Sequence, residues 1–153
     1  MDIVNFLLCS LLIIHYNLAL TYIGVTKMLK DTLIPSLILT IVAFISKIIF
    51  IAPPVIHTII LVLTISLLLS FFNKIDLILS VIGSLLSIMT STFGSLLIAW
   101  PLVIYLGFGM PKQNEVIGLQ WIIFALMEYI IPFLVLIILK TTKVSIGKYI
   151  NQR

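Results

Sequence analysis

Apolar residues follow one another in long runs along this chain, and short polar stretches divide them into five segments. Each run is close to the about 20 residues that an α-helix needs to cross a bilayer. The predicted helices cover residues 3–26, 33–51, 55–72, 77–99 and 119–139. The pattern therefore predicts an all-α integral membrane bundle of five transmembrane helices, in a single polytopic domain over residues 1–153.

Two stretches outside these helices are polar. Residues 107–118, GFGMPKQNEVIG, combine glycines, a proline and both signs of charge, which predicts an outer loop. Residues 140–153 predict a basic cytoplasmic tail. The remaining connections are short, so consecutive helices should be antiparallel neighbours.

The fourth apolar run, residues 77–107, is longer than a bilayer requires. The favoured interpretation is a helix that ends near Ala99, followed by an interfacial stretch anchored by Trp100 and Tyr105. The alternatives are a helix broken at Gly94 or a re-entrant hairpin. Two full spans do not fit in this length.

Composition supports the bilayer as the solvent of this chain. Of the 153 residues, 62% are hydrophobic and only 9% are charged. Soluble domains have about 45–50% apolar and about 25% charged residues, because their exterior must be polar. The net charge of +4 does not indicate nucleic-acid binding, since the basic residues lie mostly at the ends of apolar runs.

Lysine and arginine predict the orientation, because they are enriched on the cytoplasmic side of membrane proteins. One side of a five-helix bundle holds the connections after the first and third helices and the tail. That side carries seven basic residues: Lys27, Lys30, Lys74, Lys140, Lys143, Lys148 and Arg153. The other side carries Lys112 and Lys47. The N-terminus is therefore expected outside and the C-terminus in the cytoplasm.

The stretch IAPPVIHTII, residues 51–60, is the predicted outer turn between the second and third helices. Pro53 and Pro54 cannot continue a helix, although proline is tolerated in a first turn. His57 then lies in the first turn of the third helix, and Lys47 about one turn before the end of the second. Together they suggest a basic outer pocket for a lipid headgroup or a small peptide. The alternative is that both side chains are anchors at the headgroup boundary.

Ionisable residues inside a membrane are costly and suggest function. Glu128 lies near the middle of the fifth run, and Pro132 lacks the N–H that would bond the carbonyl of Glu128, which predicts a weakened helix or hinge. His15 lies at nearly the same depth in the first run, so a His15–Glu128 hydrogen bond is predicted. Such a pair can be simple packing between helices, or a signal-responsive or proton-sensitive element.

Small residues recur three or four positions apart in the fourth run, which places most of them on one helix face. They are Ser84, Ser87, Thr90, Ser91, Gly94 and Ser95. Such faces let membrane helices approach closely, so packing or self-association is expected.

The motifs of enzymes are missing from the sequence. Cys9 and His15 are six positions apart and so lie on different helix faces. There is no paired-histidine metal motif and no phosphate-binding or nucleotide-binding glycine loop. We therefore expect no catalytic activity, no metal and no cofactor.

The run APPVIHTIILVLTISLLLSFFNKIDLILSVIGSLLSI, residues 52–88, is similar to the membrane-sensing region of clostridial-type sensor histidine kinases, which resemble those of accessory gene regulator systems. In that region a His-Thr pair opens a long helix that ends at a short lysine-containing cytoplasmic turn, and His57-Thr58 and Lys74 match this layout. Two features depart from it. Relatives often carry an acidic residue where this chain has MTSTFGS, and only 13 residues follow Lys140, too few for a kinase. The resemblance implies a multi-pass protein of the bacterial cytoplasmic membrane without the kinase domain.

Two functions are consistent with these patterns. The first is a non-enzymatic, stand-alone sensor-like or partner-binding module, with the lipid bilayer and a signalling kinase or another membrane protein as partners. The second is a small membrane subunit of a transporter, which the polar residues at mid-depth favour. Uptake that depends on Glu128 would favour the second.

Overall fold

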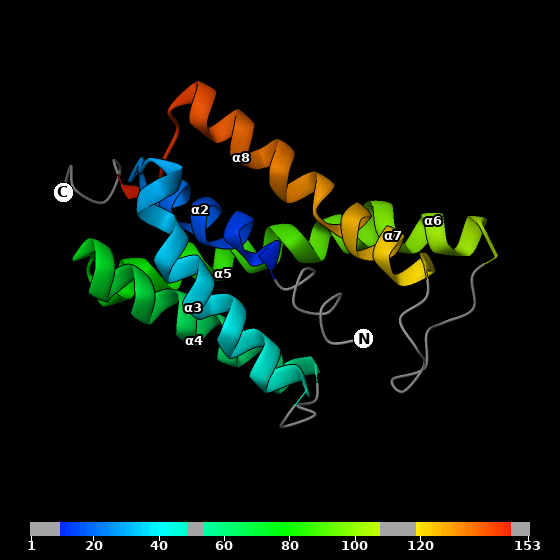
Figure 1. The fold of residues 1–153 in the computed structure, drawn as a ribbon. Helices are drawn as coiled ribbons and strands as arrows, with labels where there is room; N and C mark the ends of the chain where they lie inside the picture. The colour runs from blue at the N-terminus through cyan, green and yellow to red at the C-terminus, as the bar shows by residue number, and fades with distance from the viewer. Residues whose placement is uncertain (1–9, 49–53, 108–118, 148–153) are drawn as a thin grey trace.

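The computed structural model describes residues 10–48, 54–107 and 119–147, and every regular element within these ranges is a helix (Figure 1). In chain order they are α2 (Leu12–Ile23), α3 (Leu29–Ile48), α4 (Pro54–Asn73), α5 (Leu77–Gly94), the π-helical segment η1 (Ser95–Ala99), α6 (Trp100–Tyr105), α7 (Leu119–Glu128) and α8 (Ile130–Thr142). The predicted all-α class is therefore confirmed for the described residues.

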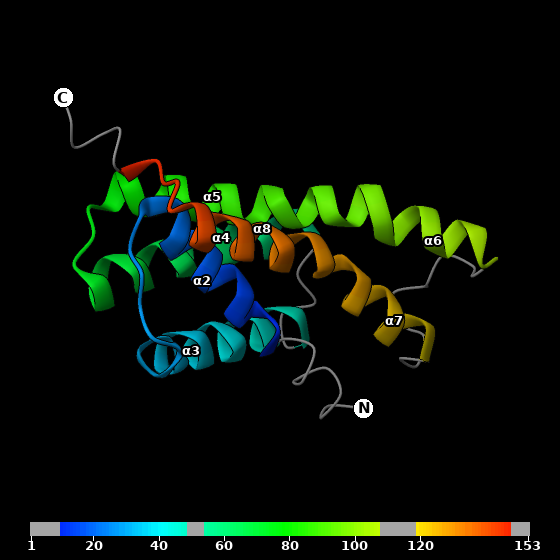
Figure 2. The ribbon, with the colours of Figure 1, turned by 90° about the horizontal axis from the view of Figure 1, so that it is seen from above.

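The helices run back and forth between two ends of the molecule. The end of α2, the link from α4 to α5 and the end of α8 lie at one end, on the left in Figure 1. The start of α4 and the far ends of α6 and α7 lie toward the other end. Figure 2 shows α5, η1 and α6 continuing one another as a single long rod. Alternating directions agree with the short connections in the sequence.

The first predicted helix ends earlier than expected. α2 stops at Ile23, because Gly24 adopts a φ of 92° and its N–H lies at the carbonyls of Leu20 and Thr21. Glycine reaches this left-handed conformation without a steric penalty and commonly ends helices in this way. The predicted end at residue 26 was therefore wrong by one turn.

The second and third predicted helices correspond to α3 and α4. α3 begins at Leu29, before the predicted residue 33, so Asp31 lies in its first turn. A negative charge is favourable there because of the helix dipole. α4 covers the predicted range 55–72 with one residue more at each end. The predicted turn at Pro53 lies outside the described residues.

The fourth predicted helix is longer than expected. It does not end near Ala99 but continues through η1 and α6, so Trp100 and Tyr105 are helical. Pro101 has no N–H to donate four residues back, which normally disrupts a helix. Here the N–H of Trp100 instead reaches the carbonyl of Ser95, five residues back, and this wider turn lets the helix continue. No re-entrant hairpin forms in residues 77–107.

The fifth predicted helix is divided in two. α7 begins at Leu119 as expected, and α8 continues to Thr142, beyond the predicted residue 139. Tyr129 separates the two helices. Of the predicted outer loop, only Gly107 lies within the described residues.

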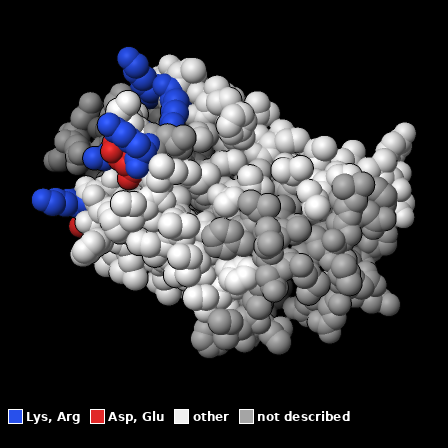
Figure 3. Space-filling model, viewed as in Figure 1, with Lys and Arg blue, Asp and Glu red and all other residues white. Residues whose placement is uncertain are grey.

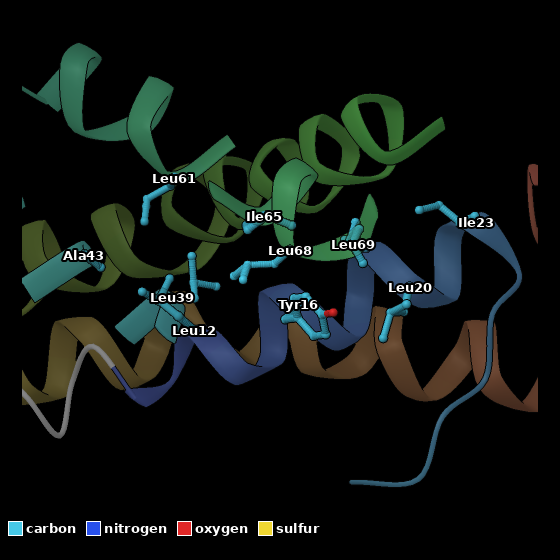
Figure 4. Packing of buried hydrophobic residues seen from close by; sticks show 11 residues of the cluster. Leu12, Tyr16, Leu20, Ile23, Leu39, Ala43, Leu61, Ile65, Leu68 and Leu69 are labelled. Atoms are coloured by element: carbon cyan, nitrogen blue, oxygen red, sulfur yellow. The ribbon is translucent and has the colours of Figure 1, made fainter. Parts of the chain in front are cut away.

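A hydrophobic core forms where α2, α3 and α4 meet (Figure 4). Tyr16 is fully buried there, and its hydroxyl accepts a 2.7 Å hydrogen bond from the Asn73 amide at the end of α4. Leu39 of α3 and Ile65 and Leu69 of α4 complete the centre of the cluster. The core therefore holds three of the predicted spans together.

The buried face of α5 consists of small residues throughout. They are Ser80, Gly83, Ser84, Ser87, Thr90, Ser91 and Gly94. At Gly83 an added Cβ would lie 2.6 Å from a side-chain carbon of Ile23, which shows how closely α2 approaches. The predicted small-residue face thus serves packing within this chain, and self-association stays a prediction.

Hydroxyl groups on this face bond to the two neighbouring helices α2 and α4. Ser84 lies 2.8 Å from the Ser66 hydroxyl of α4, and Ser87 donates to the main-chain carbonyl of His15 in α2 at 2.9 Å. Thr90 lies 2.7 Å from the Tyr22 hydroxyl. These bonds satisfy polar groups that would otherwise be buried without partners.

The outer surface of the helices is largely apolar. On α4 alone, Ile59, Leu63, Leu67 and Phe71 recur at helical spacing and are each more than half exposed. Three helices are long and apolar enough to cross a membrane, by length and composition: Val55–Asn73, Leu77–Tyr105 and Ile122–Thr142. The shorter α2 is also apolar. These features are compatible with a membrane protein.

Charged side chains gather at one end of the molecule (Figure 3). The exposed lysines of the described residues are Lys27, Lys30, Lys74, Lys140 and Lys143, accompanied by Asp31 and Asp76. They come from the ends of α3, α4, α5 and α8 and from the link after α2. Glu128, by contrast, lies within the apolar part of a helix.

The chain turns back after α8 and packs against the end of α2. Lys143 has a φ of 55°, and the N–H of Ile146 donates to the carbonyl of Tyr22 at 2.8 Å. Gly147 packs so tightly on the carbonyl of Ile23 that a Cβ would overlap the oxygen. The first part of the predicted tail therefore completes the hydrogen bonding at the end of α2.

Candidate functional site

The predicted outer site is described in part. His57 is half-buried in the first turns of α4, and its Nδ1 lies 2.8 Å from the Ser46 hydroxyl of α3. The side chain of Lys47 lies outside the described residues. The structure therefore connects His57 to α3, and a pocket shared with Lys47 stays a prediction.

Glu128 is the centre of the second candidate site. It is the last residue of α7, and its side chain is half-buried. The hydroxyl of Ser91 in α5 donates to Oε1 of Glu128 at 3.2 Å. The carboxyl group therefore connects the fourth and fifth predicted spans within the apolar part of the bundle.

The predicted His15–Glu128 hydrogen bond is not formed in this structure. His15 is only 3% exposed and contacts Tyr129, whose ring lies edge-on with the centroids 5.2 Å apart. The depth estimate brought the correct helices together, but the contact is one residue further along the chain. The estimate compared depth alone, whereas rotation about the helix axis decides which side chain faces α2.

The imidazole of His15 has an unsatisfied polar atom. Its Nδ1 is buried and has no hydrogen-bond partner among the described residues. Buried polar groups nearly always have a partner, so an exception suggests either strain or function. Together with the carboxyl group of Glu128, this nitrogen distinguishes the site from ordinary packing.

The helix interruption predicted beside Pro132 is present in the structure. α7 ends at Glu128 and α8 begins at Ile130, and the N–H of Tyr129 bonds three residues back to Leu126 at 3.3 Å. Pro132 is buried and cannot donate to the carbonyl of Glu128. Motion at this point, the predicted hinge, stays a prediction.

The interruption faces a second irregular segment. An added Cβ at Gly94, the last residue of α5, would lie 2.6 Å from the carbonyl oxygen of Glu128. The π-helical segment η1 begins at the next residue. Trp100 and Phe124 pack edge-on beyond it, with ring centroids 5.6 Å apart. Both long helices are thus irregular where they touch, and π-helical turns are frequent at functional sites.

The chemistry of this site is that of a carboxyl, a hydroxyl and an imidazole. In the described residues no group of three or more histidine, cysteine, aspartate or glutamate side chains could hold a metal ion. The three groups present can exchange protons and hydrogen bonds. Reasoning from the sequence found Glu128 and His15 but missed the roles of Ser91 and Tyr129.

Searches against protein families, curated proteins and solved structures find no match to this chain. Its class therefore rests on its own features. In the described residues it is an all-helical protein with three helices that could cross a membrane. Its candidate site lies where the interruption between α7 and α8 packs beside the π-helical turn of the Leu77–Tyr105 helix.

Proposed function

We propose that the chain is an integral membrane protein of five spans, with its N-terminus outside and its C-terminus in the cytoplasm. The charged end supports this proposal, because five exposed lysines gather there and positive charge is retained on the cytoplasmic side. The apolar surfaces of α4 and α8 provide the lipid-facing part. α2 and α3 add the two spans beyond the three longest helices.

Labelling of single cysteines tests the orientation. In a Cys9→Ser background, Lys74→Cys should react with a membrane-impermeant maleimide only after the cytoplasmic side is exposed. Asn114→Cys in the predicted outer loop should react in intact cells. The reverse pattern, or the same pattern at both positions, contradicts the orientation.

We infer that the protein is a non-enzymatic, sensor-like module that acts through a partner. The observation that supports this best is the contact around Glu128 between the interruption of the fifth span and the π-helical turn of the fourth. This contact lies between an outer arm, formed by η1, α6 and α7, and an inner part, formed by α5 and α8. An event at the outer face that moves the arm can reach the charged end through α8, whose end joins the segment packed on α2.

The resemblance of residues 52–88 to the membrane region of sensor histidine kinases agrees with this function. The sensor function requires another protein domain to carry the signal, and a signalling kinase is the partner expected. Such coupling requires two states of the arm with different affinity for the partner.

A membrane subunit of a transporter is the second candidate. A carboxyl at mid-membrane beside interrupted helices is typical of substrate and ion sites in transporters. Ser91 and Glu128 supply polar atoms at the interruption. This function predicts uptake that is lost in Glu128→Gln.

Purification of the tagged protein from its native membrane in a gentle detergent separates these functions. A co-purifying kinase or response regulator supports the sensor, provided that its yield changes in Pro132→Ala, which restores the missing N–H. Pro35→Ala is the matched control, because Pro35 is a buried helix proline far from the site along the chain. An ATPase or permease subunit supports the transporter, and recovery of the chain alone overturns the partner-dependent mechanism.

A further inference from the structure

We propose that Glu128 is a proton-binding site, and that on binding a proton its side chain exchanges the Ser91 hydroxyl for the imidazole of His15. The inference deepens the proposed sensor function and rests on it only for its biological purpose. The site itself is defined by the structure, in which Glu128 bonds to Ser91 and His15 packs against the neighbouring Tyr129.

The first argument is that hydrogen bonding at the site is incomplete. Among the described residues Glu128 receives one side-chain hydrogen bond, from Ser91, and its length of 3.2 Å exceeds the usual range for oxygen pairs. Nδ1 of His15 is buried and unpaired among the described residues. A carboxyl that turned toward His15 would satisfy that nitrogen, so a second arrangement with better hydrogen bonding is available.

The second argument is geometric. Successive residues of an α-helix are about 100° apart around its axis. Tyr129 faces His15, so a rotation of α7 by about one residue brings Glu128 to that position. The interruption between α7 and α8 lies at this point, and Pro132 has already removed one hydrogen bond that would resist the rotation.

The third argument concerns charge around the site. Of the elements packed against Glu128, α5 and η1 contain no charged or titratable residue, and α2 contributes His15 and two tyrosines, Tyr16 and Tyr22. α8 carries Lys140 twelve residues away, about 18 Å along a helix. No described cation therefore lies beside Glu128 to compensate its negative charge, and a proton can do so.

The proposed step takes up one proton from water. In the first arrangement the ionised carboxylate accepts from Ser91, and the site carries one negative charge. A proton then binds a carboxylate oxygen, forming an O–H bond, and the site becomes neutral. The new O–H donates to the lone pair of Nδ1 in His15, while Nε2 of His15 keeps its hydrogen. Release of the proton restores the bond to Ser91.

The test follows both partners in the full-length protein, reconstituted in phosphatidylcholine bilayers without any partner protein. The chain has two histidines, so ¹⁵N-histidine labelling gives a simple spectrum, and His57→Gln assigns it. Infrared spectroscopy follows the carboxyl of Glu128. As pH falls, the Nδ1 resonance of His15 should move in one step to the position of a hydrogen-bonded nitrogen. The infrared band of the neutral carboxyl should appear with the same midpoint pH. At pH values above this midpoint, the fraction of molecules in which Glu128 bonds to His15 should fall about tenfold per pH unit.

Two variants sharpen the test. In Glu128→Gln the amide N–H donates at every pH, so the resonance of His15 should stay at the hydrogen-bonded position throughout. Asp76→Asn is the matched control, because Asp76 is a carboxyl far from the site along the chain that accepts from the N–H groups of Ile78 and Leu79, and asparagine caps a helix equally well. This control should keep the step of the native chain.

Several outcomes overturn the proposal. They are a His15 resonance that does not move with pH in the native chain, a carboxyl midpoint that differs from the His15 midpoint, and a step that persists in Glu128→Gln. The comparison of the two midpoints uses the native chain alone, so it decides even if a variant does not fold. A coincident step without any co-purifying partner would support the proton site while contradicting the sensor function.

Discussion

The contact between Gly94 and the carbonyl of Glu128 allows a quantitative prediction for Gly94→Ala. The added Cβ would lie 2.6 Å from that oxygen, whereas ordinary contacts begin near 3.4 Å, a deficit of 0.8 Å. The oxygen belongs to the main chain and cannot rotate away, so the two helices must separate. A separation of 0.8 Å would lengthen the 3.2 Å bond between Ser91 and Glu128 to 4.0 Å and break it.

Gly83→Ala is the matched control, because it lies on the same helix and gains the same helix propensity, about 1 kcal/mol. Its Cβ would also meet an atom at 2.6 Å, but that atom is the flexible end of the Ile23 side chain, with the Ala19 carbonyl at 3.0 Å. Overpacking that cannot relax costs about 1–3 kcal/mol. Gly94→Ala should therefore be less stable than Gly83→Ala by about 1–3 kcal/mol, since the propensity gain cancels.

The assay is reversible unfolding of both variants in the same lipid–detergent mixture, with the native chain as reference. Infrared spectra of the two variants should also differ, since only Gly94→Ala loses the hydrogen bond to Glu128. Equal stability of the two variants, or a more stable Gly94→Ala, would refute the tight contact between α5 and the interruption at Glu128.

Three further predictions concern other parts of the fold. A double-mutant cycle of Tyr16→Phe and Asn73→Ala should give a coupling free energy of about 0.6 kcal/mol in unfolding measurements, the average for hydrogen bonds between membrane helices. A coupling near zero contradicts the 2.7 Å hydrogen bond between the Tyr16 hydroxyl and the Asn73 amide. Ile65→Ala, at a position with 0% exposure, should lower the free energy of unfolding by about 2–5 kcal/mol. Leu67→Ala on the same helix, 61% exposed, should lower it by less than about 1 kcal/mol. Equal losses in unfolding measurements would mean that the Leu67 face is covered by another protein. Gly147→Ala should release the segment after α8 and speed amide exchange there roughly 5- to 150-fold, as expected for a local loss of about 1–3 kcal/mol, and unchanged exchange contradicts the packing on α2.

The helical class and the approximate position of each span could be predicted, because long apolar runs are a strong signal. The ends were harder to predict. Gly24 ended α2 earlier than expected. A glycine ends a helix in this way only when it adopts a positive φ, which the sequence suggests but does not determine. The fourth helix was predicted to end near Ala99, but a π-helical turn carried it past Pro101.

The candidate site was predicted in part for a similar reason. Unpaired carboxyl and imidazole groups in apolar runs are conspicuous, and both Glu128 and His15 belong to the site. Which atoms meet depends on rotation about each helix axis, and one residue of error changes the partner. The depth comparison left this rotation out, and Ser91 was recognised only as a member of the small-residue face.

The hydrogen bond between Ile146 and Tyr22 has a consequence for biosynthesis. The ribosome makes the donor 124 positions after the acceptor, so the last turn of α2 cannot be completed until nearly the whole described chain has been synthesised. Until then α2 also lacks the Ser87 hydroxyl, which donates to the main-chain carbonyl of His15. A helix with unpaired polar groups is poorly soluble in lipid. We therefore expect α2 to remain beside the insertion machinery until α5 and the segment after α8 arrive, so that the earliest helix is released into the bilayer among the last.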